Sequence, residues 1–163
     1  MEIKLKEIDK KLEMREREER RKNIVIRGIK GKRNELEKEV KEILKEVGIE
    51  AEVNCKKVIE DGGDGGVRMT VIGLQELEQK RKVMIERRRL REKGIRIDDD
   101  LTWKERKMRW NLEDIARQER GDGKRVRVKY GKIQIEGKWW KWEEDEEILR
   151  DNEGKVWKRK GEE

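Results

Sequence analysis

The chain has 163 residues, of which 52% are charged and 32% hydrophobic, so it has room for one ordinary domain or two small ones with small cores. The formal net charge of +7 favours an anionic partner, with nucleic acid ahead of a membrane surface or an acidic protein. The chain has no histidine, which excludes Cys/His zinc sites and histidine-based catalysis, and its single cysteine, Cys55, excludes an intrachain disulfide. No stretch approaches the ~20 apolar residues of a membrane span. We therefore expect no membrane partner and a reducing, cytoplasmic or nuclear setting.

The first 22 residues are expected to form a charged helix. Four apolar residues near its start follow the a/d spacing of a coiled coil: Met1, Leu5, Ile8 and Leu12. This stripe covers less than two heptads, because Arg15 and Glu19 occupy the next seam positions. Two interpretations remain open: a frayed, solvated helix, or the end of a longer coiled coil that begins upstream. We favour the second and assign residues 1–22 to a coiled-coil end.

Residues 23–97 are expected to form a domain of six alternating elements. Strands are predicted over 24–29, 52–60, 67–72 and 95–97, with helices over 36–47 and 74–93 that are closed by Gly48 and Gly94. The glycine-rich run 61–66 lacks the context of a phosphate loop, so we interpret it as a hairpin connection. The order β-α-β-β-α-β is the ferredoxin-like arrangement shared by RNA-recognition motifs.

The faces of this expected sheet follow from its strand order, which is 4-1-3-2 in ferredoxin-like domains. We expect one set of residues to face the helices: Ile24, Ile26, Val67, Met69 and Val71. Alternation would then place Arg27, Arg68 and Arg96 on the open face. RNA-recognition motifs usually carry stacking aromatics there, and both central strands lack them. Guanidinium groups can still bind phosphates and stack on bases, and the alternative is that they pair with surface carboxylates.

Residues 98–151 are expected to form a second, small α+β domain. Its predicted elements are a helix from Thr102 to about residue 119, strands over 126–130 and 132–136, an extended segment over 137–142 and a short helix over 143–150. Trp103 and Trp110 should lie opposite the apolar face of the first helix, since each residue turns by about 100°. Residues 152–163 are expected to be a flexible tail.

Two further groups of basic residues favour nucleic-acid binding. The first covers the second helix of the first domain and the strand after it, and it ends with Arg91, Lys93 and Arg96. The second is interleaved with the aromatic residues Tyr130, Trp139, Trp140 and Trp142, and its basic members are Lys124, Arg125, Arg127, Lys129, Lys132, Lys138 and Lys141. Basic strands with interleaved aromatics suit single-stranded nucleic acid, because charge follows the backbone and rings stack on bases. The alternative is that Trp140 and Trp142 form the core of a small domain, which we favour for at least one of them.

Catalysis is not expected. Acidic pairs such as Asp98–Asp99 and Glu143–Glu144 are common in a chain this charged, and no other chemical group converges with them in the sequence. We therefore predict no enzyme activity, no metal site and no cofactor.

Several runs of the sequence resemble one family in the same order along the chain. They are RKNIVIRGI (21–29), LREKG (90–94), DLT (100–102) followed by ER (105–106), VRVKYGKI (126–133) and LRD (149–151). Together they resemble the RNA-binding protein encoded by the first open reading frame of LINE-type retrotransposons, the transposase 22 group. The WWKW cluster at 139–142 is more aromatic than in the better-known vertebrate members of that family.

The resemblance implies a trimeric coiled coil, an atypical RNA-recognition motif and a C-terminal domain. It implies that the protein binds single-stranded RNA and DNA, acts as a nucleic-acid chaperone, and packages retrotransposon RNA into a ribonucleoprotein. It also implies that the protein forms a homotrimer. Arg68 and Arg91 match basic family positions that are important for RNA binding, and Arg20 and Arg21 would lie where the coiled coil delivers the domain to RNA. The alternative function is a coiled-coil assembly or adaptor protein that does not bind nucleic acid.

The full set of expected contacts would form a basic cleft between the two small domains. The candidate nucleic-acid-binding residues are Arg20, Arg21, Arg27, Arg68, Arg91, Lys93, Arg96, Arg125, Arg127, Lys129, Tyr130 and Trp139.

Overall fold

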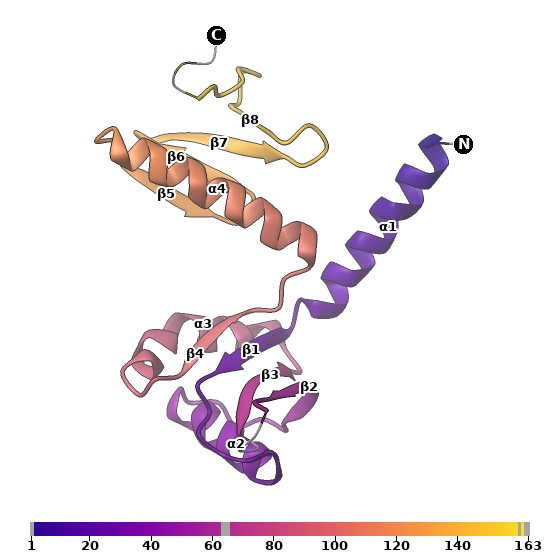
Figure 1. The fold of residues 1–163 in the computed structure, drawn as a ribbon, viewed down its shortest axis with the longest axis vertical. Coiled ribbons are helices and arrows are strands. Elements are labelled where there is room, and N and C mark those ends of the chain that lie inside the picture. The colour runs from indigo at the N-terminus through magenta and orange to yellow at the C-terminus, as the bar shows by residue number, and fades with distance from the viewer. Residues whose placement is uncertain (1, 63–65, 160, 162–163) are drawn as a thin grey trace. The chain divides into compact units, whose positions relative to one another are not determined.

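The computed structural model describes residues 2–62, 66–159 and 161 of the chain. The protein is α+β, with an N-terminal helix and two antiparallel sheets of four strands each (Figure 1). It divides into two compact units, Met1–Thr102 and Trp103–Glu163. The boundary lies five residues after the one expected from the sequence, because the segment after the fourth strand packs with the first unit.

The N-terminal helix α1, Glu2–Arg20, buries none of its described side chains. Met1 of the expected stripe lies outside the described residues, and the exposed apolar residues are the other three of the stripe and two more: Leu5, Ile8, Leu12, Ile3 and Met14. The helix is attached to the rest of its unit near its C-terminal end. There Arg20 Nη1 donates to the Leu101 carbonyl (2.9 Å), and Thr102 Oγ1 donates to Glu13 Oε2 (2.7 Å).

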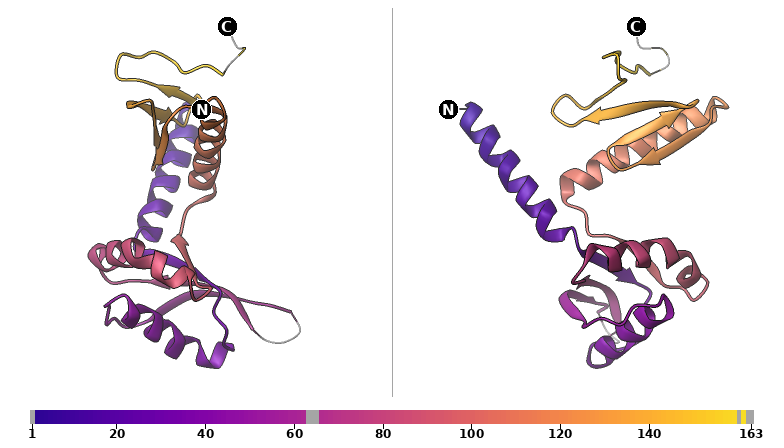
Figure 2. Two further views of the ribbon diagram at one scale, coloured as in Figure 1. Left: turned by 90° about the vertical axis from the view of Figure 1, so that its left-hand side faces the viewer. Right: turned by 180° about the vertical axis from the view of Figure 1, so that it is seen from behind.

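The first sheet follows α1 and has the strand order β2-β3-β1-β4 with antiparallel pairing throughout. Its strands are β1 (Asn23–Arg27), β2 (Asn54–Glu60), β3 (Val67–Gly73) and β4 (Arg96–Asp99). A 3-10 turn (Arg33–Glu35) and α2 (Leu36–Glu46) connect β1 to β2, and α3 (Leu77–Arg91) connects β3 to β4 (Figure 2). The succession of four strands and two helices is the one predicted, although residues 63–65 of the expected hairpin connection lie outside the described residues.

The glycines predicted to close α2 and α3 follow shortly after the last residues of these helices. Gly48 and Gly94 each have a φ of 80°, a left-handed conformation that other residues adopt only with strain. The core forms between the two helices and one face of the sheet. It includes Ile24, Ile26 and Ile97 from the strands, with Leu44 and Leu90 from the helices.

The face of this sheet that points away from the helices carries residues that were predicted to face them. Val25 pairs with Val71, and Arg27 pairs with Met69, so Met69 and Val71 lie on the open face with Arg27 and not against the helices. The prediction was wrong because it assumed regular alternation from Val67. The pairing of β2 with β3 passes from Glu60↔Val67 to Ile59↔Met69 and skips Arg68, so Val67 still joins the core.

The second unit begins with α4, Trp103–Gly121, directly after Thr102 as predicted. Four strands follow as a meander with the order β5-β6-β7-β8. They are β5 (Val126–Lys129), β6 (Lys132–Ile135), β7 (Lys138–Glu143) and β8 (Ile148–Arg150). The short helix predicted over 143–150 is wrong: these residues form the end of β7, a turn with a positive φ at Glu147 (54°), and β8.

The core of the second unit lies between α4 and one face of its sheet. Leu112 and Ala116 of α4 pack with Ile133, Trp140 and Leu149 of the strands. Trp142 packs against the same cluster, so both candidate core tryptophans contribute to it. The opposite face of α4 carries Trp103 and Trp110, which are 63% and 64% exposed, as their spacing predicts.

The segment expected to be a flexible tail makes contacts with the second unit. Val156 forms a bridge with Arg150, and the Trp157 backbone N–H donates to the Leu149 carbonyl (2.9 Å). The indole Nε1 of Trp157 donates to Glu119 Oε1 of α4 (2.8 Å). The chain therefore packs onto this unit at least as far as Trp157.

Candidate nucleic-acid interface

The open face of the second sheet carries a row of four basic residues, one from each strand. Lys129 pairs with Lys132, Lys132 with Lys141, and Lys141 with Arg150, so the four side chains lie side by side on one face. The α4 helix covers the other face, where Ile133 and Trp140 are paired and buried. We call these four residues the basic row.

Trp139 lies on the same face, in the next row of paired residues. Arg127 pairs with Gln134, and Gln134 pairs with Trp139. Lysine ammonium groups lie over the indole: Lys132 Nζ is 4.8 Å and Lys129 Nζ is 5.5 Å from its ring centroid. Such cation–π contacts hold an aromatic ring and cations together on a surface.

The turn between β6 and β7 fixes this arrangement. Glu136 and Gly137 both have positive φ, 49° and 81°, as in the two-residue turn that suits the twist of a β-hairpin. The Glu136 carboxylate accepts from the Arg125 backbone N–H (2.8 Å), which gives this strained position a partner. The resulting register directs Trp139 to the open face and Trp140 to the core.

The charges on this face are largely uncompensated. Arg127, Lys129, Lys132 and Lys141 form no ion pair within the described part of the chain. Arg150 differs, because its guanidinium contacts Glu143 (3.0 Å) and Glu146 (3.3 Å), and the hydrogen bond to Glu143 raises its pKa further. A half-buried indole beside four unpaired cations can stack on a base while the cations contact phosphates.

The first sheet carries a cluster of three arginines around one carboxylate. Asp98 Oδ2 lies 3.3 Å from Arg27 Nη1 and 3.2 Å from Arg96 Nε, and Arg87 Nη1 lies 4.0 Å from Asp98 Oδ1. Arg27 and Arg96 are paired residues of neighbouring strands, so both sequence-predicted arginines meet on the open face. Because three guanidinium groups share one carboxylate, the cluster keeps a net positive charge. The carboxylate also fixes the orientation of the two guanidinium groups that lie on the sheet.

The other predicted residues of the first unit fall into two groups. Arg68 and Arg91 are exposed and have no ion pair among the residues that the structure describes. Lys93 contacts Glu46 Oε1 (2.6 Å), Arg20 contacts Glu16 (2.6 Å) and Asp100 (3.4 Å), and Arg21 lies 3.8 Å from Glu18. Pairing with a carboxylate, the alternative considered for Arg27, Arg68 and Arg96, therefore applies to Arg27 and Arg96, which contact Asp98, and not to Arg68 within the described residues.

Arg125 and Tyr130 flank β5 in the sequence, one residue before and one residue after the strand. Tyr130 follows β5 in the turn to β6, and its hydroxyl donates to the buried Glu105 carboxylate of α4. This hydrogen bond ties the β5–β6 turn to α4, although the residue remains 62% exposed. The Arg125 side chain is exposed and free of ion pairs in the described structure.

Sequence reasoning left part of the basic row out of the candidate residues. Lys132 and Lys141 belong to the basic group recognised in the sequence but are not among the candidate residues, although alternation from the buried Ile133 and Trp140 places them on the same face as Trp139. Arg150 could not be found in this way, because its segment was predicted to be a helix.

Two ionisable groups outside the candidate interface have shifted pKa values. A hydrogen bond from Lys124 to Glu119 raises the pKa of that lysine, and burial raises the pKa of the Cys55 thiol. The described residues contain no group of three His, Cys, Asp or Glu side chains that could hold a metal ion.

Comparison with known proteins yields no family assignment. No model of a protein family matches the sequence, and no curated protein matches it. Across the described residues, no helix has both the length and the apolar character needed to cross a bilayer.

Proposed function

We propose that this protein binds single-stranded RNA and DNA without catalysis. The observation that carries the proposal is the open face of the second sheet, where Trp139 lies beside Arg127 and the lysines of the basic row. Unpaired cations supply affinity for any phosphate backbone, and the indole adds stacking that tolerates every base. The expected binding therefore has little sequence specificity.

The first unit would act as an RNA-recognition-motif-like module of ferredoxin-like topology. Its strand order β2-β3-β1-β4 and its two helices on one face support this assignment. The exposed Arg68 and Arg91 and the arginine cluster around Asp98 would contribute phosphate contacts. With the family resemblance, these features favour a retrotransposon RNA-packaging protein with chaperone activity, found in cytoplasmic or nuclear ribonucleoproteins.

The second candidate is a coiled-coil assembly or adaptor protein that does not bind nucleic acid. The exposed Leu5, Ile8 and Leu12 of α1 favour it, since they find no core among the described residues of their own chain. Self-association through α1 is compatible with both candidates, whereas nucleic-acid binding distinguishes them.

A salt titration tests the proposal. Filter binding of a single-stranded RNA oligonucleotide should give a log K that falls with log [salt] by roughly 0.7 per phosphate contacted. If Arg127, Lys129, Lys132 and Lys141 each contact one phosphate, the second unit alone contributes a slope of about −3. Lys141→Ala should reduce the slope by about 0.7, because one phosphate contact is lost.

The control for this variant is Lys104→Ala, which removes an exposed lysine from α4, on the other side of the same unit. This change should leave the slope as it is in the unaltered protein. Absence of RNA binding by the unaltered protein at low salt would refute the proposal and favour the adaptor.

A further inference from the structure

Two asparagines face each other across a glycine on the open face of the first sheet. Asn23 of β1 and Asn54 of β2 both pair with Gly73 of β3, so the three residues form one row across the sheet. A Cβ at Gly73 would lie 3.4 Å from Asn23 Oδ1 and 3.5 Å from Asn54 Nδ2. The missing side chain therefore leaves a gap between one hydrogen-bond acceptor and one donor. We call this gap the amide slot.

Asn23 brings an unpaired acceptor to the slot. The residue is 4% exposed, and its Nδ2 donates to Asp100 Oδ2 (2.9 Å), which fixes the orientation of the amide. Its Oδ1 is buried and has no hydrogen-bond partner in the described structure. Buried polar atoms are nearly always paired, so an orphaned acceptor beside a gap indicates a donor that comes from outside the chain.

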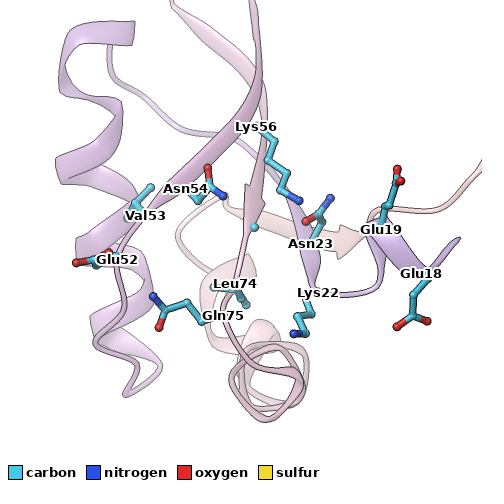
Figure 3. A pocket seen from close by; sticks show the side chains of 11 residues that line it. Glu18, Glu19, Lys22, Asn23, Glu52, Val53, Asn54, Lys56, Leu74 and Gln75 are labelled. Atoms are coloured by element: carbon cyan, nitrogen blue, oxygen red, sulfur yellow. The ribbon is translucent and has the colours of Figure 1, made fainter. Parts of the chain in front are cut away.

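Lys56 covers the slot with a flexible side chain. The pairing of β2 with β3 passes from Cys55↔Ile72 to Lys57↔Val71 and skips Lys56, a bulge that frees its side chain from the row. Its Cε lies 2.7 Å from the position of a Gly73 Cβ, and the side chain extends toward Asn23 (Figure 3). Lys56 is exposed and forms no ion pair within the described residues, so a ligand can displace it at low cost.

The slot opens into a cavity of about 640 Å³, within the range of small-molecule sites. The cavity lining is polar and carries three carboxylates and two ammonium groups: Glu18, Glu19, Glu52, Lys22 and Lys56. The opposite charges of these side chains nearly cancel, so the cavity suits a neutral, polar ligand that can donate hydrogen bonds better than it suits a phosphate. On the same face of the sheet, Arg27 lies four residues along β1 from Asn23, roughly 13 Å away, and can contact a phosphate outside the cavity.

We propose that the amide slot binds a base of single-stranded nucleic acid through its hydrogen-bonding edge, which rests on the proposed function. Base edges present donors and acceptors next to each other, and asparagine amides recognise them in this way. The base would donate to Asn23 Oδ1 and accept from Asn54 Nδ2, while the displaced Lys56 becomes available to a neighbouring phosphate. This contact would replace the aromatic stacking that the first sheet lacks.

Filling the slot tests the inference. Gly73→Ala places a methyl group between the two amides, and only the end of the flexible Lys56 side chain must move. The full-length variant should bind a mixed-sequence RNA oligonucleotide about tenfold more weakly, because a bidentate base contact is lost. The slope of log K against log [salt] should stay the same, since no cation is removed. Binding of an abasic oligonucleotide of the same length should not change.

The matched control is Gly121→Ala at the end of α4, where a Cβ would meet nothing within 4 Å. Asn54→Ala, at an exposed position, should reproduce the selective loss, and it carries the test if Gly73→Ala lowers the melting temperature strongly. Unchanged RNA affinity in the folded slot variants would overturn the inference and leave water as the occupant. Failure of the unaltered protein to bind either oligonucleotide would instead refute the proposed function.

Discussion

At the residue scale, Trp139 and Trp140 show how register assigns opposite roles to neighbours. Trp140 is 8% exposed and pairs with Ile133 inside the core, while Trp139 lies on the opposite face beside Lys129 and Lys132. The two residues have the same chemistry, so only the alternation of the strand separates them. The candidate interface therefore depends on the β6–β7 turn as much as on the aromatic side chain.

This difference predicts that Trp139→Ala weakens RNA binding with little loss of stability. Removal of a stacking partner costs about 1–3 kcal/mol of binding free energy, which is roughly a 5- to 150-fold loss in affinity. The salt slope should not change, because Trp139 carries no charge. Filter binding and thermal melting of the same variant measure the two effects separately.

Trp103→Ala is the control for the Trp139 variant. Trp103 is 63% exposed and has Lys107 at 5.5 Å from its ring centroid, so it also combines an indole with a lysine. It lies on the outer face of α4, away from the open face of the sheet in the same unit. An equal loss of RNA affinity in both variants would contradict a binding role confined to the sheet.

At the scale of elements, the spacing of apolar residues along the sequence was sufficient to predict the helices in which that spacing is regular. The helices α2 and α3 and the glycines that follow them could be predicted from spacing alone, as could the exposed positions of Trp103 and Trp110 on α4. These features depend on residues within a few positions of one another, so the sequence contains all the information needed to predict them.

The local sequence pattern predicted the wrong structure where pairing between strands determines the conformation of a segment. The acidic run 143–147 resembles a helix start, yet Trp142 pairs with Leu149 and turns the segment into a hairpin. At Arg68 the skipped residue in the pairing with β2 reversed the expected faces of Met69 and Val71. The amide slot depends on the same kind of information, because Asn23, Asn54 and Gly73 meet only through strand order.

The segment after β8 gives a prediction about acid stability. Asp151 Oδ1 accepts from the backbone N–H groups of Glu153 (3.0 Å) and Lys155 (2.8 Å), and Oδ2 contacts Lys138 Nζ (2.7 Å). The hydrogen bond from Lys138 is the largest contribution that lowers the pKa of this carboxyl. Its stabilising effect is therefore complete above the ordinary pKa of about 4 and is lost as the pH falls through the lower folded-state value.

We expect Asp151→Asn to lower the melting temperature by a few degrees at pH 7. Below about pH 4 the melting temperature of the variant should decrease less steeply than that of the unaltered protein. Thermal melts between pH 7 and pH 2 measure both effects. Asp145→Asn provides a control, because Asp145 is exposed in the β7–β8 turn and has no partner within the described structure. A parallel pH profile for the Asp151 variant and the unaltered protein would show that this carboxylate does not stabilise the fold.

At the scale of the whole molecule, α1 carries apolar surface that its own unit does not cover. Leu5, Ile8 and Leu12 lie on one face of the helix and are 52–61% exposed. Ile3 is 73% exposed and lies about 160° from Leu5 around the helix axis. Exposed a/d positions on a helix are usually buried by other helices of the same kind. We therefore expect the protein to associate with further copies of itself through this face of α1.

The stripe spans less than two heptads, so the association should be weak and should increase with protein concentration. Sedimentation equilibrium over a wide concentration range should reveal trimers that Ile8→Lys converts to monomers, since a buried, unpaired ammonium opposes packing at the seam. Ile3→Lys adds the same charge on the opposite face and should leave the assembly intact. If both variants reduce the assembly equally, net charge and not the stripe controls self-association. A molecular mass that stays monomeric at every concentration would exclude self-association through α1 and leave RNA binding to single chains.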